Sequence, residues 1–321
     1  MRILPDGAVA DLLSLDALLP VVEDAFRRQG RSAVERPERP HFPVGTDDDG
    51  NDPAGTGLVM PAYLHGEATY ATKLVSVHEA NPPDRPTVQA QVAVTDAATG
   101  DPLALVAGER VTNARTGCIG GLTARDLAVG SGPVTLGVVG AGQQARWQTR
   151  AIDAARGVAT ARIFSPSDSR ERCAAELRER GIDAEAVGSA RAAVSDADVV
   201  VTATTATEPV FPADALADGT LVVAVGAYSP EMQELDAAVL DRAPRVFADV
   251  PEEATETGDL LAAGVDDPVA LSEVFEGRTG RESADEMLVV ESVGSAVLDA
   301  ATAAHLCERA EKTDAGETVA F

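Results

Sequence analysis

Residues 134–145 read VTLGVVGAGQQA, and this stretch decides the fold of the second half of the chain. Its first six residues form a short β-branched run of the kind found in buried parallel strands. The next six fit the pattern G-x-G-x-x-G/A, and an amphipathic helix is expected over 144–156. In such a turn Gly140 permits the tight bend, Gly142 lets the backbone approach a pyrophosphate, and Ala145 packs closely on the strand. The helix N-terminus, with Gln143 and Gln144, offers free N–H groups to phosphates, so the stretch predicts a dinucleotide site.

The pattern continues downstream of this turn. Short β-branched runs alternate with Ala-rich amphipathic segments, and further strands are expected at 160–164, 198–203, 221–225 and 245–248. A second helix is expected at 169–180. Strands that alternate with helices at this spacing favour parallel βαβ units, and hence a doubly wound α/β domain.

The first part of the chain has a different pattern. A helix is expected over 11–30, a loop over 31–56, and a helix over 112–129. Runs punctuated by Gly and Pro at 57–63, 68–77, 88–96 and 103–107 predict a mostly antiparallel sheet. A final Ala-rich helix near 293–310, with no strand after it, would return to this sheet and make the first domain discontinuous.

The end of the second strand of the doubly wound domain bears on the choice of dinucleotide. An NAD site usually has Asp or Glu there to bind the ribose 2′-hydroxyl. Here Ser165 and Ser167 occupy that place and Arg170 follows, which suits a 2′-phosphate and favours NADP. Asp168 supports the alternative, NAD, if the loop turns back. A third possibility is that Ser167 or Ser169 only caps the next helix.

Composition excludes several classes of function. The 321 residues include 52 acidic and 26 basic side chains, a net charge of −26, which repels nucleic acid and anionic membranes. No apolar run reaches the length of a spanning helix, and the N-terminus lacks a signal-peptide core, so we expect a cytoplasmic protein. The three Cys residues are scattered without metal spacing, which favours reduced thiols and no metal site.

Arg far outnumbers Lys among the basic residues. Of the 26, 24 are Arg, and only Lys73 and Lys312 are Lys. Excess acid, scarce Lys and small apolar residues resemble a protein from a salt-loving organism, where salt screens the self-repulsion. Lys73 is therefore conspicuous. It lies within the apolar run Tyr70-Ala71-Thr72-Lys73-Leu74-Val75, so its side chain must meet an anion or shift its pKa.

Several stretches, in order and spacing, resemble the ornithine cyclodeaminase/mu-crystallin family over nearly the whole chain. They are RPERPH (36–41), MPAY (60–63), TKLV (72–75), TNART (112–116), GAGQQA (140–145), DADVV (196–200), VGA (225–227), QELD (233–236) and SVG (292–294). The resemblance implies a homodimer, with a substrate-binding and dimerisation domain at 1–122 and 293–321. It also implies an inserted NAD(P)-binding Rossmann domain at 123–292.

The resemblance also assigns roles to residues. Arg39, Lys73 and Arg115 match positions that bind a substrate carboxylate, and Thr112 matches a position beside the nicotinamide. Thr202 and Thr204 match a ridge that contacts the cofactor, and Gly226 is expected to contact it too.

The position two residues after Gly226 separates the reactions that the family hosts. The cyclodeaminase branch has an Asp there, which handles the substrate amine, whereas this chain has Tyr228. A phenol with a pKa near 10 cannot replace a carboxylate as base at neutral pH. Tyr228 is therefore either a catalytic residue of another kind or a packing residue at the strand end.

The leading hypothesis is an NADPH-dependent reductase of small α-imino or cyclic imino acids, such as pyrroline-2-carboxylate. Lys73, or a water that it holds, would donate the proton to the developing amine. Alanine dehydrogenase is the second hypothesis, because its imine intermediate needs the same groups. Ornithine cyclodeaminase, a lyase that recycles NAD, is the third. A non-enzymatic mu-crystallin-like binding protein is the fourth, and the retained Arg39, Lys73 and Arg115 argue against it.

Overall fold

The computed structural model describes residues 1–46, 50, 52–78, 80–82 and 85–320. The chain divides into two compact units, of which unit 1 comprises Met1–Arg115 and Ser295–Phe321 and unit 2 comprises Thr116–Gly294. The sequence suggests boundaries at 122/123 and 292/293. The structural division falls at 115/116, within the helix α3 (Gly108–Leu127), and at 294/295, just before the last helix.

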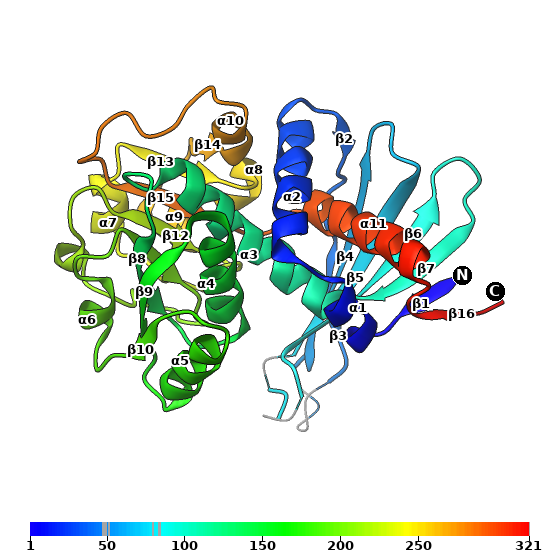
Figure 1. The fold of residues 1–321 in the computed structure, drawn as a ribbon, viewed down its shortest axis with the longest axis horizontal. Coiled ribbons are helices and arrows are strands. Elements are labelled where there is room, and N and C mark those ends of the chain that lie inside the picture. Colours follow the sequence, from blue (N-terminus) through cyan, green and yellow to red (C-terminus); the bar gives the residue numbers. More distant parts are fainter. Residues whose placement is uncertain (47–49, 51, 79, 83–84, 321) are drawn as a thin grey trace. The chain divides into compact units, whose positions relative to one another are not determined.

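Unit 1 is built on a mixed sheet whose strands follow the order β16-β1-β7-β6-β5-β4-β2, with β3 paired to β4 (Figure 1). Neighbours pair antiparallel except β1 and β7, which run parallel. The strands are β1 (Arg2–Leu4), β2 (Val34–Glu35), β3 (His41–Val44), β4 (Gly55–Leu64), β5 (Thr69–Val77), β6 (Val88–Asp96), β7 (Pro102–Ala107) and β16 (Glu317–Thr318).

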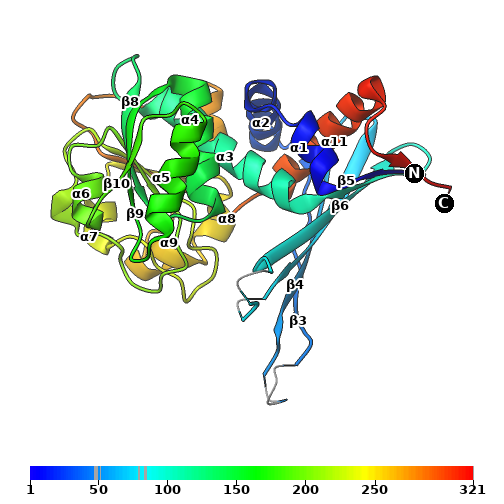
Figure 2. The same cartoon turned by 60° about the horizontal axis from the view of Figure 1, so that its bottom comes forward.

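Helices cover one face of this sheet. The C-terminal helix α11 (Ala296–Thr313) packs on β4, β5 and β6 and against α2 (Leu15–Gly30), as Figure 2 shows. Strand β5 alternates as a half-buried strand should, with Ala71, Lys73 and Val75 buried and Leu74 exposed. The alternation therefore directs Lys73 to the buried face of the sheet.

Three details of unit 1 differ from the sequence-based prediction. The single helix expected at 11–30 is two helices, α1 (Asp6–Leu12) and α2, because Leu13 and Ser14 adopt extended backbone and Ser14 stands at the N-cap of α2. The loop expected at 31–56 contains β2 and β3, although its residues 47–49 and 51 lie outside the described part. The final helix is followed by a strand after all, since β16 pairs with β1.

Unit 2 contains the predicted doubly wound parallel sheet, and this prediction is confirmed. Every pair in the order β10-β9-β8-β11-β12-β15-β13-β14 is parallel. The chain leaves β8 in one direction to form β9 and β10, then crosses to the other side of β8 to form β11 and β12. Ligands of such sheets bind at the carboxyl ends of the strands beside this reversal. The strands are β8 (Val134–Val139), β9 (Val158–Phe164), β10 (Ala184–Ala186), β11 (Val199–Thr202), β12 (Leu221–Ala224), β13 (Arg245–Ala248), β14 (Val269–Ala270) and β15 (Leu288–Glu291).

Helices lie on both faces of the parallel sheet. Figure 2 shows α4 and α5 on one side and α6 and α7 on the other. The helices of unit 2 beyond α3 are α4 (Gln143–Arg156), α5 (Ser169–Glu179), α6 (Ala190–Val194), α7 (Ala237–Arg242), α8 (Pro251–Ala254), α9 (Gly258–Ala263) and α10 (Leu271–Phe275). Within the described residues, no helix of either unit combines the length and the hydrophobicity that a bilayer crossing needs.

Candidate functional site

Unit 1 contains a buried group of three charged side chains, Lys73, Arg115 and Asp299, which we call the cation cluster. Lys73 Nζ lies 2.6 Å from Asp299 Oδ2, and Arg115 Nε lies 3.0 Å from Asp299 Oδ1. The three residues are 2%, 4% and 1% exposed. They come from β5, α3 and the first turn of α11, so the fold joins elements that are far apart in sequence.

The position of Asp299 suits a carboxylate. Ser295 caps α11 by accepting a hydrogen bond from Val297 N, and Asp299 stands in the first turn of that helix. The helix dipole stabilises a negative charge there. Burial alone would raise the pKa of Asp299, but the charges of Arg115 and Lys73 and their hydrogen bonds hold it below its ordinary value.

The pKa of Lys73 is lowered from 10.5 to about 8. Burial is the main cause, and the positive charges of Arg115 and Arg39 lower it further, whereas Asp299 raises it. Arg39 therefore acts electrostatically on Lys73, as a partly buried residue of the otherwise largely exposed segment between β2 and β3. The structure thus joins two of the three cations that the resemblance names, Lys73 and Arg115, through one anion, and Arg39 acts on Lys73 by its charge.

Two features of the cation cluster leave capacity for a ligand. Lys73 Nζ is 3.5 Å from Thr112 Oγ1, one helical turn before Arg115 on α3, so Asp299 and Thr112 engage two of its three N–H bonds. In the described part of the chain Arg115 makes its single hydrogen bond through Nε, and its two NH₂ groups make none. A guanidinium with both NH₂ groups unengaged can bind a carboxylate.

In unit 2 the Gly-rich turn has the geometry that a pyrophosphate needs. Gly140 has φ 113°, and a Cβ there would lie 2.3 Å from Ala203 O, so only glycine fits. A Cβ on Gly142 would meet open space, and no side chain caps the first turn of α4. Gln143 and Gln144 begin α4, and Ala145 is fully buried against the sheet. The residues therefore fit a dinucleotide, whose phosphates the N–H groups of α4 would hold.

The end of β9 holds a cluster of three hydroxyls. Ser169 Oγ lies 3.0 Å from Ser165 Oγ and 2.7 Å from Ser167 Oγ. Arg170 donates to Ser165 O at 2.8 Å, and Asp168 is exposed at the N-cap of α5 without forming a side-chain cap. The three hydroxyls can turn to donate to a phosphate.

The segments after β11 and β12 meet around a buried carboxylate. Thr202 and Thr204 both bind Glu234, the first through its hydroxyl at 2.9 Å and the second through its main-chain N–H at 2.6 Å. Gly226 N donates to Glu234 Oε2 at 2.8 Å. Thr202 is fully buried, so its hydroxyl serves Glu234. Tyr228 follows in the same segment and is 38% exposed.

Glu234 belongs to a group of four buried acids, Glu234, Asp249, Asp259 and Glu291, which we call the strand-end acids. They lie near the carboxyl ends of β12, β15 and β13, since Glu291 pairs with Ala224 and with Ala248. Asp249 accepts hydrogen bonds from Ser292 Oγ, Val293 N and Gly294 N. Burial raises the pKa of Glu234 to about 7 and that of Asp259 to about 6. Burial and the other three acids raise the pKa of Glu291 well above its usual value.

Sequence reasoning missed the roles of two acids, Asp299 and Glu234. Asp299 is absent from the predicted site, although an Asp in an Ala-rich apolar helix signals a buried anion as plainly as Lys73 signals a buried cation. Glu234 falls in a matched stretch, but nothing local indicates that it binds two strand-end segments. Within the described residues no group of His, Cys, Asp or Glu is arranged to hold a metal ion.

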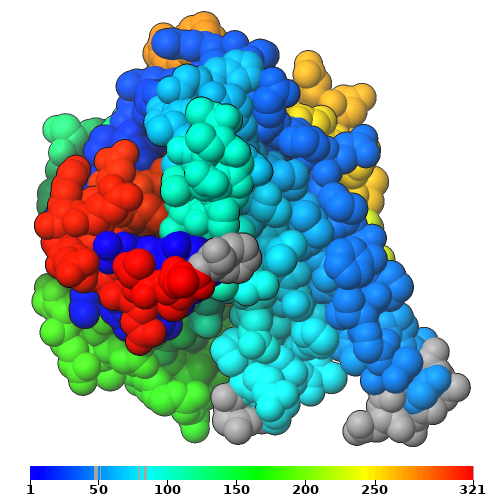
Figure 3. Space-filling model, turned by 90° about the vertical axis from the view of Figure 1, so that its right-hand side faces the viewer, coloured from blue at the N-terminus to red at the C-terminus, as the bar shows by residue number. Residues whose placement is uncertain are grey.

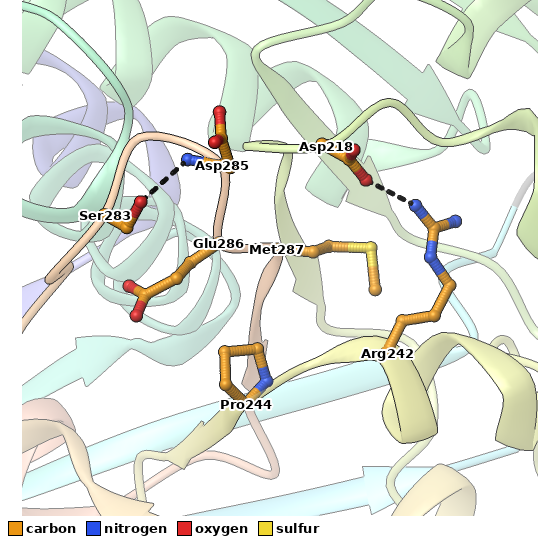
Figure 4. Close-up of a pocket in the computed structure, with 7 residues that line it drawn as sticks. All are labelled: Asp218, Arg242, Pro244, Ser283, Asp285, Glu286 and Met287. Atoms are coloured by element: carbon orange, nitrogen blue, oxygen red, sulfur yellow. Dashed lines mark hydrogen bonds and ion pairs between the residues drawn. The ribbon is translucent and has the colours of Figure 1, made fainter.

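A surface hollow of unit 2 lies away from the carboxyl ends of the parallel strands. Figure 4 shows it lined by Asp218, Arg242, Pro244, Ser283, Asp285, Glu286 and Met287. These residues surround the amino ends of β12, β13 and β15, which begin at Leu221, Arg245 and Leu288. The hollow is therefore at the amino ends of the strands, whereas the Gly-rich turn is at the carboxyl end of β8.

Comparison with known proteins gives one consistent result. The model of the ornithine cyclodeaminase/mu-crystallin family matches residues 3–314. A Delta(1)-pyrroline-2-carboxylate reductase of Bacillus cereus is 33% identical over 296 residues, 88% of this chain and 90% of that protein.

Two solved structures superpose over nearly the whole chain. Delta(1)-pyrroline-2-carboxylate reductase of Thermococcus litoralis, in complex with NADH and L-proline, has a TM-score of 0.91 and 30% identity, covering 99% of this chain and 100% of its own. An archaeal alanine dehydrogenase dimer with bound NAD has a TM-score of 0.91 and 30% identity, covering 100% and 99%.

Proposed function

Because the chain belongs to the ornithine cyclodeaminase/mu-crystallin family, we propose that it is an NAD(P)H-dependent reductase of small α-imino or cyclic imino acids. A representative reaction is Δ1-pyrroline-2-carboxylate + NAD(P)H + H⁺ → proline + NAD(P)⁺. The observation that carries the proposal is the cation cluster, in which a buried lysine and a buried arginine share one carboxylate and keep hydrogen-bonding capacity. The reduced nicotinamide, when bound, supplies the hydride that adds to the carbon of the C=N bond.

The first task of the cation cluster is to hold the substrate carboxylate. Arg39, Lys73 and Arg115 carry three positive charges when Lys73 is protonated, and Asp299 carries one negative charge. The surplus is positive, and Lys73 and Arg115 are buried, so the cations favour a small anion over water. The NH₂ groups of Arg115 would bind the carboxylate oxygens, and Asp299 holds the guanidinium in place through Nε at 3.0 Å.

The second task is to deliver a proton to the imine nitrogen. A general acid works best when its pKa lies near the operating pH, and the pKa of Lys73 is about 8. The third N–H bond of its ammonium, beyond those directed at Asp299 and Thr112, is the proton that we assign to the nitrogen. Thr112 is proposed to lie beside the nicotinamide, and Tyr228 remains a proposed catalytic residue.

A second candidate function is alanine dehydrogenase. The archaeal alanine dehydrogenase superposes on this chain with the same TM-score, 0.91, as the pyrroline-2-carboxylate reductase. Reductive amination of pyruvate passes through an imine that also bears a carboxylate, so it would use the same cluster. Cyclodeamination of ornithine is less favoured, since Tyr228 stands where that reaction needs a carboxylate.

The cofactor preference that we propose is NADP. The two solved structures hold NADH and NAD, so this preference rests on the cluster of Ser165, Ser167 and Ser169 with Arg170 beside it. Replacing Ser165 with Asp places a negative charge against a 2′-phosphate, and we expect KM for NADPH to rise by about tenfold or more with NADH little affected. Ser165→Ala, which removes the hydroxyl without adding charge, is the control. A wild-type protein that uses NADH at least as well as NADPH would contradict the preference.

The assembly that we propose is a homodimer formed through unit 1. Its sheet has α11 on one face, and apolar side chains are exposed from its strands: Phe42 (46%), Tyr70 (38%), Leu74 (41%) and Leu103 (38%). In Figure 3 these strands, coloured blue to cyan, form a broad surface to one side of the red α11. A second copy is the proposed occupant, because the related archaeal alanine dehydrogenase is a dimer.

Salt is part of the proposed setting. The net charge of −26 and the use of 24 Arg against two Lys support a halophilic source. Assays should therefore include strong salt, which screens the repulsion between surface carboxylates.

The proposal is tested with a panel of substrates at high salt. Pyrroline-2-carboxylate, other cyclic imino acids, pyruvate plus ammonia, and ornithine are each offered with NADPH and NADH or their oxidised forms. We expect stoichiometric oxidation of the reduced cofactor with an imino acid. Formation of proline from ornithine without net change in cofactor absorbance would instead identify a cyclodeaminase, and no turnover with any substrate would favour a binding protein.

A further inference from the structure

The carboxylate of Glu234 joins the two segments that follow β11 and β12. Its Oε1 accepts Thr204 N at 2.6 Å, and its Oε2 accepts Thr202 Oγ1 at 2.9 Å and Gly226 N at 2.8 Å. The side chain is fully buried. Each oxygen therefore has protein donors from the strand-end segments, and none faces solvent.

The two segments approach each other so closely that no side chain fits between them. A Cβ on Gly226 would lie 2.3 Å from Thr204 O and 2.5 Å from Glu234 Oε1. Main-chain bonds extend the contact, because Gln233 N donates to Ala206 O and Val210 N donates to Glu234 O, each at 2.9 Å. Within the described residues, the close approach of the two segments leaves Thr204 N and Gly226 N without main-chain acceptors, and the Glu234 carboxylate accepts a hydrogen bond from each.

A second acid fixes the backbone of Glu234 itself. Asp259 Oδ1, from the first turn of α9, accepts Glu234 N at 2.7 Å and Leu235 N at 2.8 Å. Its other oxygen, Oδ2, is buried without a partner in the described residues. Asp259 therefore holds Glu234 in the position from which it reaches both segments.

The joined segments border the predicted dinucleotide site. A Cβ on Gly140 would lie only 2.3 Å from Ala203 O, so the segment after β11 contacts the Gly-rich turn. In doubly wound sheets the nicotinamide half of a dinucleotide crosses to the strands beyond the reversal, which here are β11 and β12. The segments that Glu234 joins are thus the ones that this half would contact.

We propose that Glu234, held by Asp259, is a positioning residue that fixes the segments after β11 and β12 in the form that binds the nicotinamide half of the cofactor. The inference rests on the proposed function for the identity of the ligand. It excludes Glu234 as the base of the reaction, because its oxygens are engaged by three donors and shielded from any substrate.

The chemistry of the amide predicts which substitutions matter. In Glu234→Gln one acceptor oxygen becomes an NH₂ group, which faces either Thr204 N or Gly226 N and leaves it without an acceptor. Asp259→Asn keeps the oxygen that accepts Glu234 N and Leu235 N, since the NH₂ group takes the place of the unpartnered oxygen. Asp259→Ala removes both bonds.

The test measures cofactor affinity directly, without turnover. Trp147 is the only Trp of the chain and lies in α4, so energy transfer from it to bound NADPH or NADH reports binding. We expect the Kd of Glu234→Gln, which leaves one main-chain N–H group unpaired, to rise by about tenfold, and that of Asp259→Ala, which leaves two unpaired, to rise by at least as much. Asp259→Asn should stay within about twofold of wild type on the same arithmetic.

A stability-matched variant separates positioning from general weakening. Val222→Ala, in the buried middle of β12, removes core packing and lowers Tm without touching the joined segments. Its Kd should equal that of wild type. An unchanged Kd in Glu234→Gln, or an equal rise in Val222→Ala, would overturn the inference alone. If Glu234→Gln does not fold, Asp259→Ala against Asp259→Asn decides in the same way. A wild-type chain that binds neither dinucleotide would overturn the proposed function as well.

Discussion

The cation cluster of unit 1 and the strand-end acids of unit 2 both bury charge, but they compensate it differently. In the cation cluster opposite charges meet, with Asp299 between Lys73 and Arg115 at 2.6 and 3.0 Å. The strand-end acids are all carboxyl groups without a cation among them, and main-chain N–H groups and hydroxyls bind them, as at Glu234 and Asp249.

The cation cluster and the strand-end acids are therefore suited to different tasks. Burial lowers the pKa of Lys73 to about 8 although Asp299 raises it, and Lys73 keeps a donor to spare, which suits proton transfer. Hydrogen bonds from the backbone to Glu234 and Asp259 fix the chain at the ends of the strands, and burial raises the pKa of both acids even though those bonds lower it. Perturbed pKa values alone therefore do not distinguish a reacting group from a positioning one. The partners of the group do.

The largest expected effect is that of Lys73→Ala. Removing the proposed proton donor and one carboxylate contact should lower kcat/KM by about a thousandfold or more. Cofactor Kd should not change, because Lys73 is in unit 1 and Arg115 still neutralises Asp299. Steady-state kinetics and cofactor titration check both statements. Lys312→Ala, at the only other Lys and on the exposed end of α11, is the matched control. Turnover near wild type in Lys73→Ala would show that the substrate site is elsewhere.

Asp299→Asn breaks the cation cluster from its other side. Two buried cations lose their anion, and we expect a loss of about 3 kcal/mol in the free energy of unfolding, measured in denaturant. The charge of Asp299 raises the pKa of Lys73, so without it that pKa falls below about 8. Because the general acid must be protonated, kcat/KM of wild type should decline as pH rises through about 8, and the decline should begin at lower pH in the variant. If the decline of kcat/KM occurs at the same pH in the variant as in wild type, Lys73 is not the group that transfers the proton.

The smallest expected effect concerns the strand-end acids and pH. The pKa of Glu291 is raised in the folded chain by burial and by its acidic neighbours, and its Oε1 has no partner among the described residues. The stability that the protonated Glu291 side chain gives to the folded chain is fully present below about pH 4.5. It is lost as pH rises through the folded-state pKa of Glu291. Glu291→Gln removes that loss, so its Tm should exceed that of wild type by a few degrees at pH 8 and match it at pH 4.

Glu286→Gln supplies the opposite sign within the same unit. A hydrogen bond from Glu282 N is the main reason that the pKa of Glu286 is lowered. A lowered pKa gives stability that is present above the unfolded-state pKa, so this variant should lose Tm at pH 8. If Glu291→Gln and Glu286→Gln both raise Tm at pH 8, or both lower it, the expected difference in sign between the two acids is contradicted.

Sequence reasoning reached the fold of unit 2 because its signals are local. The glycines and Ala145 lie within six residues of one another, and the strand before them has a readable pattern. The missed strands have few residues or little pattern, such as β16, which has two residues and pairs with β1 at the other end of the chain.

The candidate site divides in the same way. Lys73 was recognisable as a cation that needs an anion, but its partner Asp299 is 226 residues away in sequence. Only the packing of α11 on β5 brings them together. Glu234 likewise acts on Thr204 and Gly226 through space, and no spacing rule in the sequence indicates that contact.

The most direct test of the central claim compares two substrates of the wild-type protein that differ only in the carboxylate. Δ1-Pyrroline-2-carboxylate and Δ1-pyrroline share the ring and the C=N bond, and initial rates of NADPH oxidation give kcat/KM for each. If the cation cluster binds the carboxylate, removal of that group leaves buried donors unpaired, and kcat/KM should fall by about a thousandfold. Equal kcat/KM for the two compounds would contradict the account.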